Sequence, residues 1–298
     1  MAIPFVTDMT YEYGDLQQQT PMVRRLVCSN SGPFTFAGTN SYVIGRGKVA
    51  VVDPGPADQR HIDAMLKALE GETVTHILIT HTHRDHSPAA AAIKQATGAK
   101  TYAYGPHGGG KALMGEQVEA GGDMDFVPDV LLTHEEIIKQ DGWTVQAVHT
   151  PGHTSNHMCF ALLEEKALFT GDHILSWSTT IVSPPDGDMN DYMKSLDILL
   201  ARDEEVIWPA HGDKILNPGE FVQAYKDHRL QRYDQINNLL AQGPSTIPQM
   251  VPTMYAAVDK ALHPAAQRSV LAHMIHLTET GTVACDGKPG LDSEYRLA

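Results

Sequence analysis

The 298-residue sequence is poor in cysteine and contains no long apolar run. Its three cysteines, Cys28, Cys159 and Cys285, lie far apart and form no C-x-x-C pair, which argues against a disulfide framework and is typical of free thiols in a reducing compartment. No apolar stretch is long enough to span a membrane, and the first thirty residues are polar instead of containing the apolar core of a signal peptide. We therefore expect a cytoplasmic protein with no membrane contact.

Basic residues are also scarce. The sequence has 22 lysines and arginines against 36 aspartates and glutamates, which gives a formal net charge of −14 at pH 7 with histidine neutral. Such a chain repels phosphate groups, which argues against nonspecific binding to nucleic acid or to an anionic membrane but does not exclude a nucleic-acid substrate held by metal ions. The length suffices for one large domain with a full core and one small domain.

Histidine, by contrast, is abundant, with sixteen residues that partly fall in clusters. The densest cluster is the segment 81–86 (HTHRDH), which holds three imidazoles and one carboxylate. The apolar segment 75–80 before it predicts a short buried strand, and the segment 87–98 after it predicts a helix that Ser87 caps and Gly98 ends. The cluster therefore follows the carboxyl end of a strand, where open α/β sheets commonly bind ligands.

The spacing inside this cluster suits metal ions. In an extended or loosely turned loop, His81 and His83 can share one cation, while Asp85 and His86 lie slightly further on and can serve a second. Neutral imidazole and carboxylate are ligands of zinc and related transition metals. The alternative is a surface loop that is merely rich in histidine.

Other predicted strands end in the same way, with a histidine or an aspartate beside a glycine. Hairpin-like strands within 41–52 and 158–170, together with intervening helices, predict an α/β layered fold. Five imidazoles and two carboxylates are about what two cations need if one carboxylate bridges them. The polar residues at these strand ends are His81, His83, Asp85, His86, His153, Asp172 and His211.

The motifs HTHRDH, HTPGHT, GD and PAHG, in this order and spacing, resemble the metallo-β-lactamase superfamily over nearly the whole first domain. The resemblance implies an αββα metallo-β-lactamase sandwich with metal ions at one edge. It also implies a ligand set for each ion. The first metal would be held by His81, His83 and His153, the second by Asp85, His86 and His211, and Asp172 would bridge them.

Departures from other branches narrow this resemblance. Flavodiiron members have a glutamate in place of His83, and broad-spectrum β-lactamases use a cysteine where Asp172 stands. The pattern instead resembles glyoxalase II, ribonuclease Z and lactonases, and most of all the β-lactamase-like protein 2 group, whose members are described as single-stranded-RNA endonucleases or thioesterases. The resemblance implies two zinc ions (Zn2+) per chain, with manganese or iron as alternatives.

After Gly212 the sequence changes character, and three helical segments precede a hairpin-like tail that together resemble a small winged-helix domain. We therefore expect a catalytic domain at 1–216 and a winged-helix-like domain at 217–298. From Glu220 onward, seven basic residues stand against eight acidic ones, which is not the basic surface that DNA binding needs. We expect this domain to line the active-site cleft or to offer a contact surface.

Several residues near the motifs are candidates for roles around the metal ions, each with a plainer alternative. Asp53 matches a residue that supports the metal loop in the superfamily, but it also suits a simple turn. His157 could orient substrate or carry a proton, or it could be a hydrogen-bonded structural histidine. Trp177 and Thr179 are expected to line the cleft, where Thr179 and Thr180 could offer hydroxyls to an oxyanion or a phosphate.

Two further loops, both rich in glycine and turn residues, could lie near the site. The loop 30–39 carries Phe34 and Phe36, which we expect to pack in the core more readily than to form a flap over the site. The segment 105–126 lacks the spacing of a phosphate-binding loop, so we expect a flexible insertion near the site.

The motifs together predict a dinuclear zinc hydrolase in which a hydroxide that bridges the metals attacks an electrophilic carbonyl or phosphorus, with Asp85 handling its proton. The acidic surface favours a small-molecule or acyl substrate such as an ester or thioester. An RNA phosphodiester is an alternative from the resemblance. A mononuclear iron oxygenase, or a non-catalytic metal-binding module of the same fold, is the remaining alternative.

Overall fold

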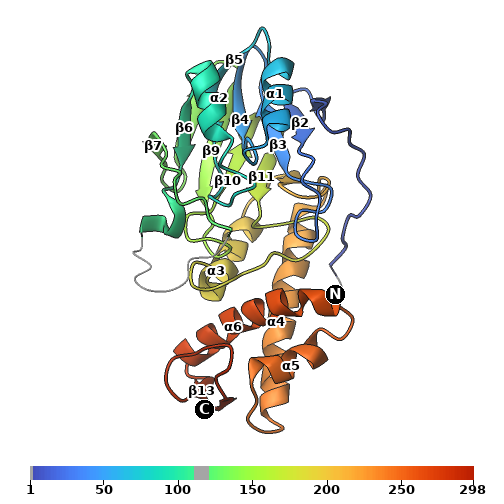
Figure 1. Cartoon of the computed structure of the whole chain (residues 1–298), viewed down its shortest axis with the longest axis vertical. Coiled ribbons are helices and arrows are strands. Elements are labelled where there is room, and N and C mark those ends of the chain that lie inside the picture. Colours follow the sequence, from blue (N-terminus) through green and yellow to red (C-terminus); the bar gives the residue numbers. More distant parts are fainter. Residues whose placement is uncertain (1–2, 111–120) are drawn as a thin grey trace.

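The computed structural model describes residues 3–110 and 121–298, which form a layered body with a smaller helical module beside it (Figure 1). In the body two sheets pack face to face, and helices cover the outer face of each. The layers therefore follow the order helices, sheet, sheet, helices, which is the αββα arrangement expected from the sequence.

The first sheet has its strands in chain order. These strands are β1 (Gln17–Gln18), β2 (Val23–Val27), β3 (Asn40–Ile44), β4 (Lys48–Val52), β5 (Thr73–Leu78), β6 (Lys100–Ala103) and β7 (Val130–Leu131). Strands β1 to β4 are antiparallel neighbours, whereas β4 to β7 are parallel. Parallel neighbours need a crossover connection, and the helices α1 (Gln59–Ala68) and α2 (Ala90–Thr97) lie in the first two of them.

The second sheet has the order β12-β11-β10-β9-β8. Its strands are β8 (Ile137–Gln140), β9 (Trp143–His149), β10 (Met158–Leu162), β11 (Ala167–Gly171) and β12 (Val206–Pro209). Only β11 and β12 pair in parallel within this sheet, and the helix α3 (Met189–Leu200) lies between them in the chain. Short 3-10 turns occur at η1 (His107–Gly110), η2 (Leu163–Glu165) and η3 (Lys260–Leu262).

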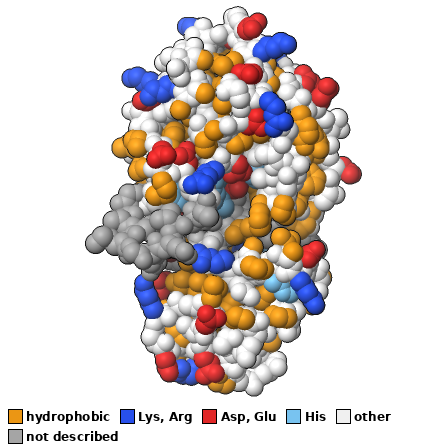
Figure 2. Space-filling model, viewed as in Figure 1, with side chains coloured by type: hydrophobic (Ala, Val, Ile, Leu, Met, Phe, Trp, Pro, Cys, Tyr) orange, Lys and Arg blue, Asp and Glu red, His pale blue; other side chains and the backbone are white. Residues whose placement is uncertain are grey.

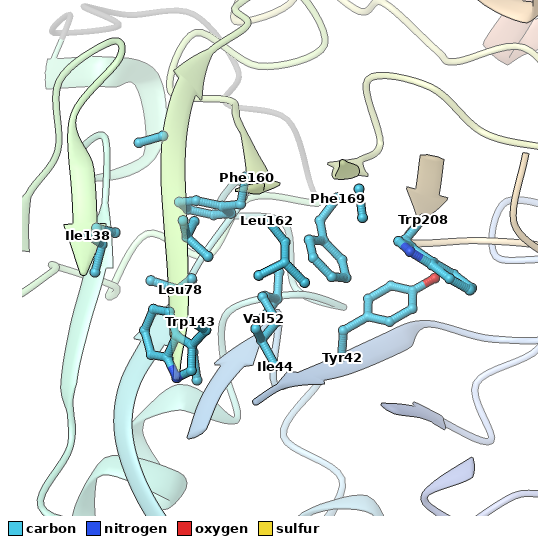
Figure 3. Close-up of a cluster of buried hydrophobic side chains, with 14 of the residues drawn as sticks. Tyr42, Ile44, Val52, Leu78, Ile138, Trp143, Phe160, Leu162, Phe169 and Trp208 are labelled. Atoms are coloured by element: carbon cyan, nitrogen blue, oxygen red, sulfur yellow. The ribbon is translucent and has the colours of Figure 1, made fainter. Parts of the chain in front are cut away.

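A layer of buried apolar side chains joins the two sheets (Figure 3). Successive residues of a strand point to opposite faces, so Ile44 and Val52 face the other sheet while their neighbours Val43 and Val51 face the helices. The Tyr42 hydroxyl crosses the layer and donates to the carbonyl of Pro209 at 2.7 Å. This pairing of the sheets brings the ends of β5, β11 and β12 to one edge of the body.

Helix α2 starts later than predicted. It begins at Ala90, and Ser87 does not cap it, because the Ser87 hydroxyl donates to the carboxylate of Asp123 at 2.6 Å. The other end agrees with the sequence, since Gly98 follows the helix with φ = 75°, a left-handed conformation that glycine adopts at no steric cost.

Helix α4 (Pro218–Leu240) belongs to both parts of the molecule. Its 23 residues extend over about 35 Å, and Figure 1 shows it passing from the sandwich into the lower module. Phe221 and Tyr225 pack with α3 on the outer face of the second sheet, whereas Ile236 and Leu240 belong to the core of the module. The boundary at residues 216 and 217, just before α4, stays a prediction.

The rest of the module consists of α5 (Ile247–Met254), α6 (His263–Glu279) and the hairpin of β13 (Val283–Cys285) and β14 (Tyr295–Leu297). This is the predicted arrangement of helices followed by a hairpin. Within the residues that the structure describes, no helix combines the length and the apolar character needed to cross a bilayer.

Candidate metal centre

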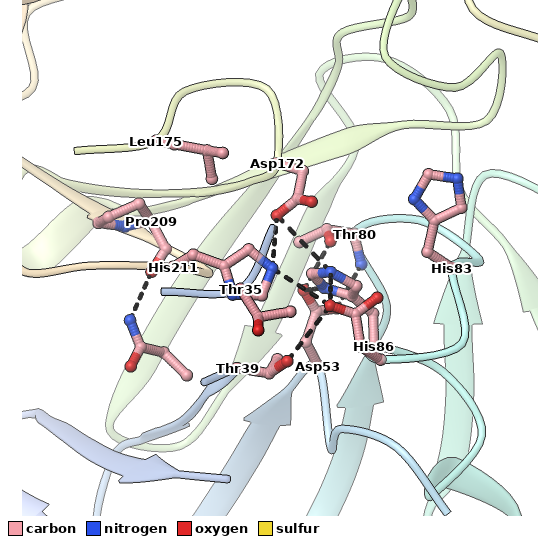
Figure 4. A network of polar contacts seen from close by, with 12 residues as sticks. Thr35, Thr39, Asp53, Thr80, His83, His86, Asp172, Leu175, Pro209 and His211 are labelled. Carbon is pink, nitrogen blue, oxygen red and sulfur yellow. Dashed lines mark hydrogen bonds and ion pairs between the residues drawn. The ribbon is translucent and has the colours of Figure 1, made fainter. Parts of the chain in front are cut away.

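Loops at one edge of the sandwich bring together the residues that the sequence singled out as metal ligands, of which Figure 4 labels His83, His86, Asp172 and His211. His81, His83, Asp85 and His86 follow β5, His153 lies between β9 and β10, Asp172 follows β11, and His211 follows β12. Backbone and side-chain hydrogen bonds join the two sheets at this edge. The backbone amide of Met158 donates to the carbonyl of Thr80 at 2.7 Å. The side-chain amide of Asn40 donates to the carbonyls of Pro209 and Gly212 at 3.0 and 2.8 Å.

Three imidazoles form the first group. Nε2 of His81 lies 3.0 Å from Nδ1 of His83, and Nε2 of His153 lies 3.1 Å from the same nitrogen. Together with a carboxylate oxygen of Asp172, these atoms all lie within 4.8 Å of one another. One cation could therefore contact all four side chains.

The second group combines a carboxylate with two imidazoles. Oδ2 of Asp85 lies 3.2 Å from Nε2 of His211 and 3.3 Å from Nε2 of His86. These three ligand atoms also satisfy the distances that a single cation requires. The Asp85 side chain is 27 % exposed, whereas those of His86 and His211 are buried, so this group opens to solvent on the side of Asp85.

Asp172 lies between the two groups and presents one oxygen to each. Its Oδ1 is 3.3 Å from Nε2 of His211 and 3.6 Å from Nε2 of His86, while its Oδ2 is 3.7 Å from Nε2 of His153. A single carboxylate therefore faces both candidate cation positions. Figure 2 shows histidine and acidic side chains together near the middle of the visible face.

Asp53 orients one histidine of each group. Its Oδ2 accepts from Nδ1 of His86 at 3.0 Å and from the Thr80 hydroxyl at 2.6 Å, and that hydroxyl lies 3.0 Å from Nδ1 of His81. Bonds at Nδ1 leave Nε2 of both rings free to face the cluster. Asp53 is thus a hydrogen-bonded support and more than a turn residue, although its φ of 47° also places it in a turn. Thr80 was not predicted, and a hydroxyl directly before the first histidine is the only signal for it.

Other ligand rings are held by backbone carbonyls. Nδ1 of His153 donates to Ile181 at 2.6 Å, and Nδ1 of His211 donates to Gly38 at 3.1 Å. The Thr39 hydroxyl donates to Oδ2 of Asp85 at 3.3 Å. The loop 30–39 therefore supports the second group at two points, a role that its sequence did not reveal.

Burial and neighbouring charges together determine which side chains of the cluster are charged. Burial lowers the pKa of His81 well below its usual range, with help from the neighbouring imidazoles, so this ring is neutral. Burial also opposes charge on His86 and Asp172, but their mutual attraction outweighs it. The carboxylates of Asp85 and Asp172 raise the pKa of His86, and the imidazoles of His211 and His86 hold the pKa of Asp172 below its usual range.

The chemistry of this donor set fits a divalent metal ion. Imidazole nitrogen and carboxylate oxygen are ligands of zinc, manganese and iron. Oδ1 of Asp172 and Nε2 of His86 are buried without a hydrogen bond, which leaves both atoms available to a cation. The cluster therefore suggests a divalent metal.

The remaining candidates differ in how close they come to the surface. His157 is fully buried, packs 5.2 Å from the ring of His81 and shares a hydrogen bond of 2.9 Å with the Thr150 hydroxyl, which favours the structural alternative. Trp177 is half-buried and stacks on Phe36 at 5.2 Å between ring centroids. Thr179 is half-buried in the same loop.

Two expectations for these loops are wrong. Phe34 does not pack in the core, because 52 % of it is exposed. Thr180 does not offer a free hydroxyl to a substrate, because this buried group donates to the carbonyls of Asp172 and His173 at 2.8 and 3.0 Å.

The predicted insertion 105–126 is described only in part, since residues 111–120 lie outside the described ranges. In the described part after residue 120, Gly122 forms a β-bridge with His83, and the backbone amide of Asp123 donates to the carbonyl of Thr82 at 2.7 Å. This end of the insertion is therefore attached to the histidine loop, and no motif in the sequence indicates that contact.

Comparisons with known proteins agree with this geometry. A family model described as "Metallo-beta-lactamase superfamily" matches residues 34–211, and one described as "Beta-lactamase associated winged helix domain" matches residues 246–291. The "Lactamase-like protein adaB" of Aspergillus niger is 28 % identical over 318 residues, covering 96 % of this chain and 93 % of its own length. The "Atrochrysone carboxyl ACP thioesterase" of Aspergillus chevalieri is 30 % identical over 273 residues, covering 86 % and 82 %.

A solved "Beta-lactamase domain protein" from Burkholderia ambifaria has the same fold, with a TM-score of 0.79 at 20 % identity over 98 % of this chain and 96 % of that one. The chain therefore belongs to the metallo-β-lactamase superfamily and carries the winged-helix domain associated with it. Within that superfamily it is a hydrolase, so the family, the fold class and the enzyme class predicted from the sequence are confirmed.

Proposed function

We propose that this chain is a dinuclear, zinc-dependent thioesterase that hydrolyses an acyl thioester to a carboxylic acid and a thiol. The observation that carries the proposal is Asp172, whose Oδ1 and Oδ2 face different histidine groups. The thioester is supported by the relative named as an ACP thioesterase, which the chain matches over most of its length. The acidic composition favours such a substrate over RNA.

In this proposal His81, His83 and His153 would hold one cation, Asp85, His86 and His211 would hold the other, and Asp172 would serve both. When bound, such cations lower the pKa of a coordinated water to about 7 and polarise a carbonyl, which supplies a nucleophile at neutral pH. In the reaction, a bond forms between the acyl carbon and the oxygen of water, and the carbon–sulfur bond breaks.

The side chains of the chain itself handle orientation and the proton. Asp85 is the candidate proton carrier, because it is the most exposed carboxylate of the cluster and Thr39 fixes the oxygen Oδ2. It would take the proton from water and return it to the leaving thiolate. Trp177 belongs to the loop that follows Asp172 and stacks on Phe36, and this pair would contact the acyl group.

The test is a panel of substrates for the zinc-loaded protein: an acyl thioester, its oxoester analogue, a lactone, a β-lactam, an aryl phosphodiester and single-stranded RNA. We expect the thioester to be cleaved fastest, the activity to disappear on chelation and to return with zinc, and two metal ions per chain by elemental analysis. Faster cleavage of RNA or of the phosphodiester would contradict the substrate, and full activity with one iron or no metal would contradict the mechanism.

A further inference from the structure

The loop that follows β11 carries Asp172 and has no regular secondary structure of its own before α3. Its backbone is nevertheless held at several points. The Thr180 hydroxyl donates to the carbonyl of Asp172 at 2.8 Å, and the Tyr192 hydroxyl donates to the carbonyl of His173 at 2.7 Å. The position of Asp172 therefore depends on where Thr180 lies.

Helix α4, which leads into the winged-helix module, contacts this loop through the hydroxyl of Tyr225. The Leu175 amide donates to that hydroxyl at 3.0 Å, and the hydroxyl lies within hydrogen-bond distance of the carbonyls of Leu175, at 2.6 Å, and of Ser178. Tyr225 is fully buried, so water cannot replace these bonds. One phenol thus fixes both sides of the turn that carries Trp177.

One helical turn later, on the same face of α4, Arg229 continues this contact. Its guanidinium donates to the carbonyl of Thr180 and stands 5.1 Å from the centre of the Tyr192 ring. The residue is 1 % exposed, and no carboxylate among the described residues lies within ion-pair distance of it. A buried cation without an anion is costly, so its contacts with a carbonyl and an aromatic face are what holds it there.

We propose that Tyr225 and Arg229 are positioning residues, which hold residues 172–180 in the conformation that directs both oxygens of Asp172 into the metal centre. The proposal rests on the proposed function. Its consequence is that α4 joins the module to the active site: the helix that begins the C-terminal part of the chain also sets the geometry of the residue facing both cations.

The test compares three variants of the full-length protein. Tyr225→Phe removes only the hydroxyl that holds the loop. Tyr233→Phe is the matched control, because Tyr233 lies on the same helix and bonds Nδ1 of His276 at 2.5 Å within the module, away from the loop. Arg229→Lys keeps the positive charge but replaces the planar guanidinium group with an ammonium group. Each is measured for kcat, KM, thermal midpoint and the visible absorption spectrum of the cobalt-substituted protein.

We expect Tyr225→Phe and Arg229→Lys to lower kcat about 10-fold or more, to weaken cobalt binding and to change the cobalt spectrum, as for other residues that orient ligands. Tyr233→Phe should reduce the thermal midpoint without changing kcat or the spectrum. If Tyr225→Phe loses stability but keeps the wild-type spectrum and cobalt affinity, its role is only structural and the proposal is wrong.

A second pair of variants tests the same contact from the side of the loop. Thr180→Val removes the hydroxyl that bonds Asp172, and Thr180→Ser retains it, so the spectrum should change in the first and recover in the second. The cobalt spectrum requires no substrate. A wild type that binds cobalt but cleaves no thioester would therefore overturn the proposed reaction and leave the positioning role to be decided by the spectra.

Discussion

The sandwich and the C-terminal module contribute to the metal centre in different ways. The sandwich provides all seven candidate ligands, each from a loop that follows a strand. The described part of the module provides none of them, and α4 instead contacts the backbone of the loop after β11. Changes at the edge of the sandwich should therefore remove metal, while changes at the far end of the module should affect only stability.

The largest effect is expected from Asp172→Ala. The substitution removes the carboxylate that presents one oxygen to each group, so at least one cation should be lost per chain and kcat/KM should fall more than about 10³-fold. Metal content by elemental analysis and thioester turnover measure this. Asp203→Ala, at an exposed site on the same sandwich, is the matched control and should retain both. Full turnover in Asp172→Ala would refute the assignment.

A smaller loss is expected from Asp53→Asn, which acts through the histidines and not on the metal directly. Asparagine tolerates the positive φ at this position, so the backbone should be preserved while the acceptor for Nδ1 of His86 becomes a poorer one. Zinc affinity, measured by competition with a chromophoric chelator, should fall by about 10- to 100-fold. The control is Asp63→Asn on the exposed face of α1, and equal affinities in the two variants would contradict the role of Asp53.

The ligands could be predicted from the sequence because each stands in a short motif at the end of an apolar run. The hairpin-like segments that predicted β3, β4 and β10 are apolar because their side chains build the core, so an α/β layered fold followed from them, whereas the αββα sandwich came from the family resemblance. A histidine directly after a buried strand can be recognised without knowing the partner strand. The ligand sets themselves came from the family resemblance.

The supports could not be predicted in this way. Thr80 and Thr39 bond their partners across distances of 27 and 46 residues, and Tyr225 bonds a backbone carbonyl 47 residues away. A carbonyl is present at every residue, so no sequence pattern marks the one that accepts the bond. The predictions for Phe34 and for the start of α2 were wrong for a related reason. Contacts with neighbouring loops determine how exposed Phe34 is and where α2 begins.

Acid should destabilise the module through His273. This ring is fully buried, and burial, together with the charges of Arg229, His228 and Arg232, lowers its pKa to about 3. It packs against the ring of Tyr233. The unfolded chain has a pKa near 6.5 there and binds more protons between these values, so the free energy of unfolding falls as the pH falls, by about 1 kcal/mol at pH 5.5.

His273→Gln removes this titration, so the difference in unfolding free energy between pH 8 and pH 5.5 should shrink by about 1 kcal/mol in urea denaturation. A pH dependence equal to that of the wild type in His273→Gln would show that the buried ring is not the source.

The smallest effect concerns the far end of the module, where Gln249 caps α5. Its side-chain oxygen accepts from the amide of Thr246 at 2.9 Å, and its loss in Gln249→Ala should cost about 0.5–1 kcal/mol of stability. Gln231→Ala, on the exposed surface of α4, is the control and should cost less. Since the buried side chains of α5 pack in the core of the module with α4 and α6, kcat and the cobalt spectrum should remain those of the wild type. A change in either would show that the whole module, and not α4 alone, is coupled to the metal centre.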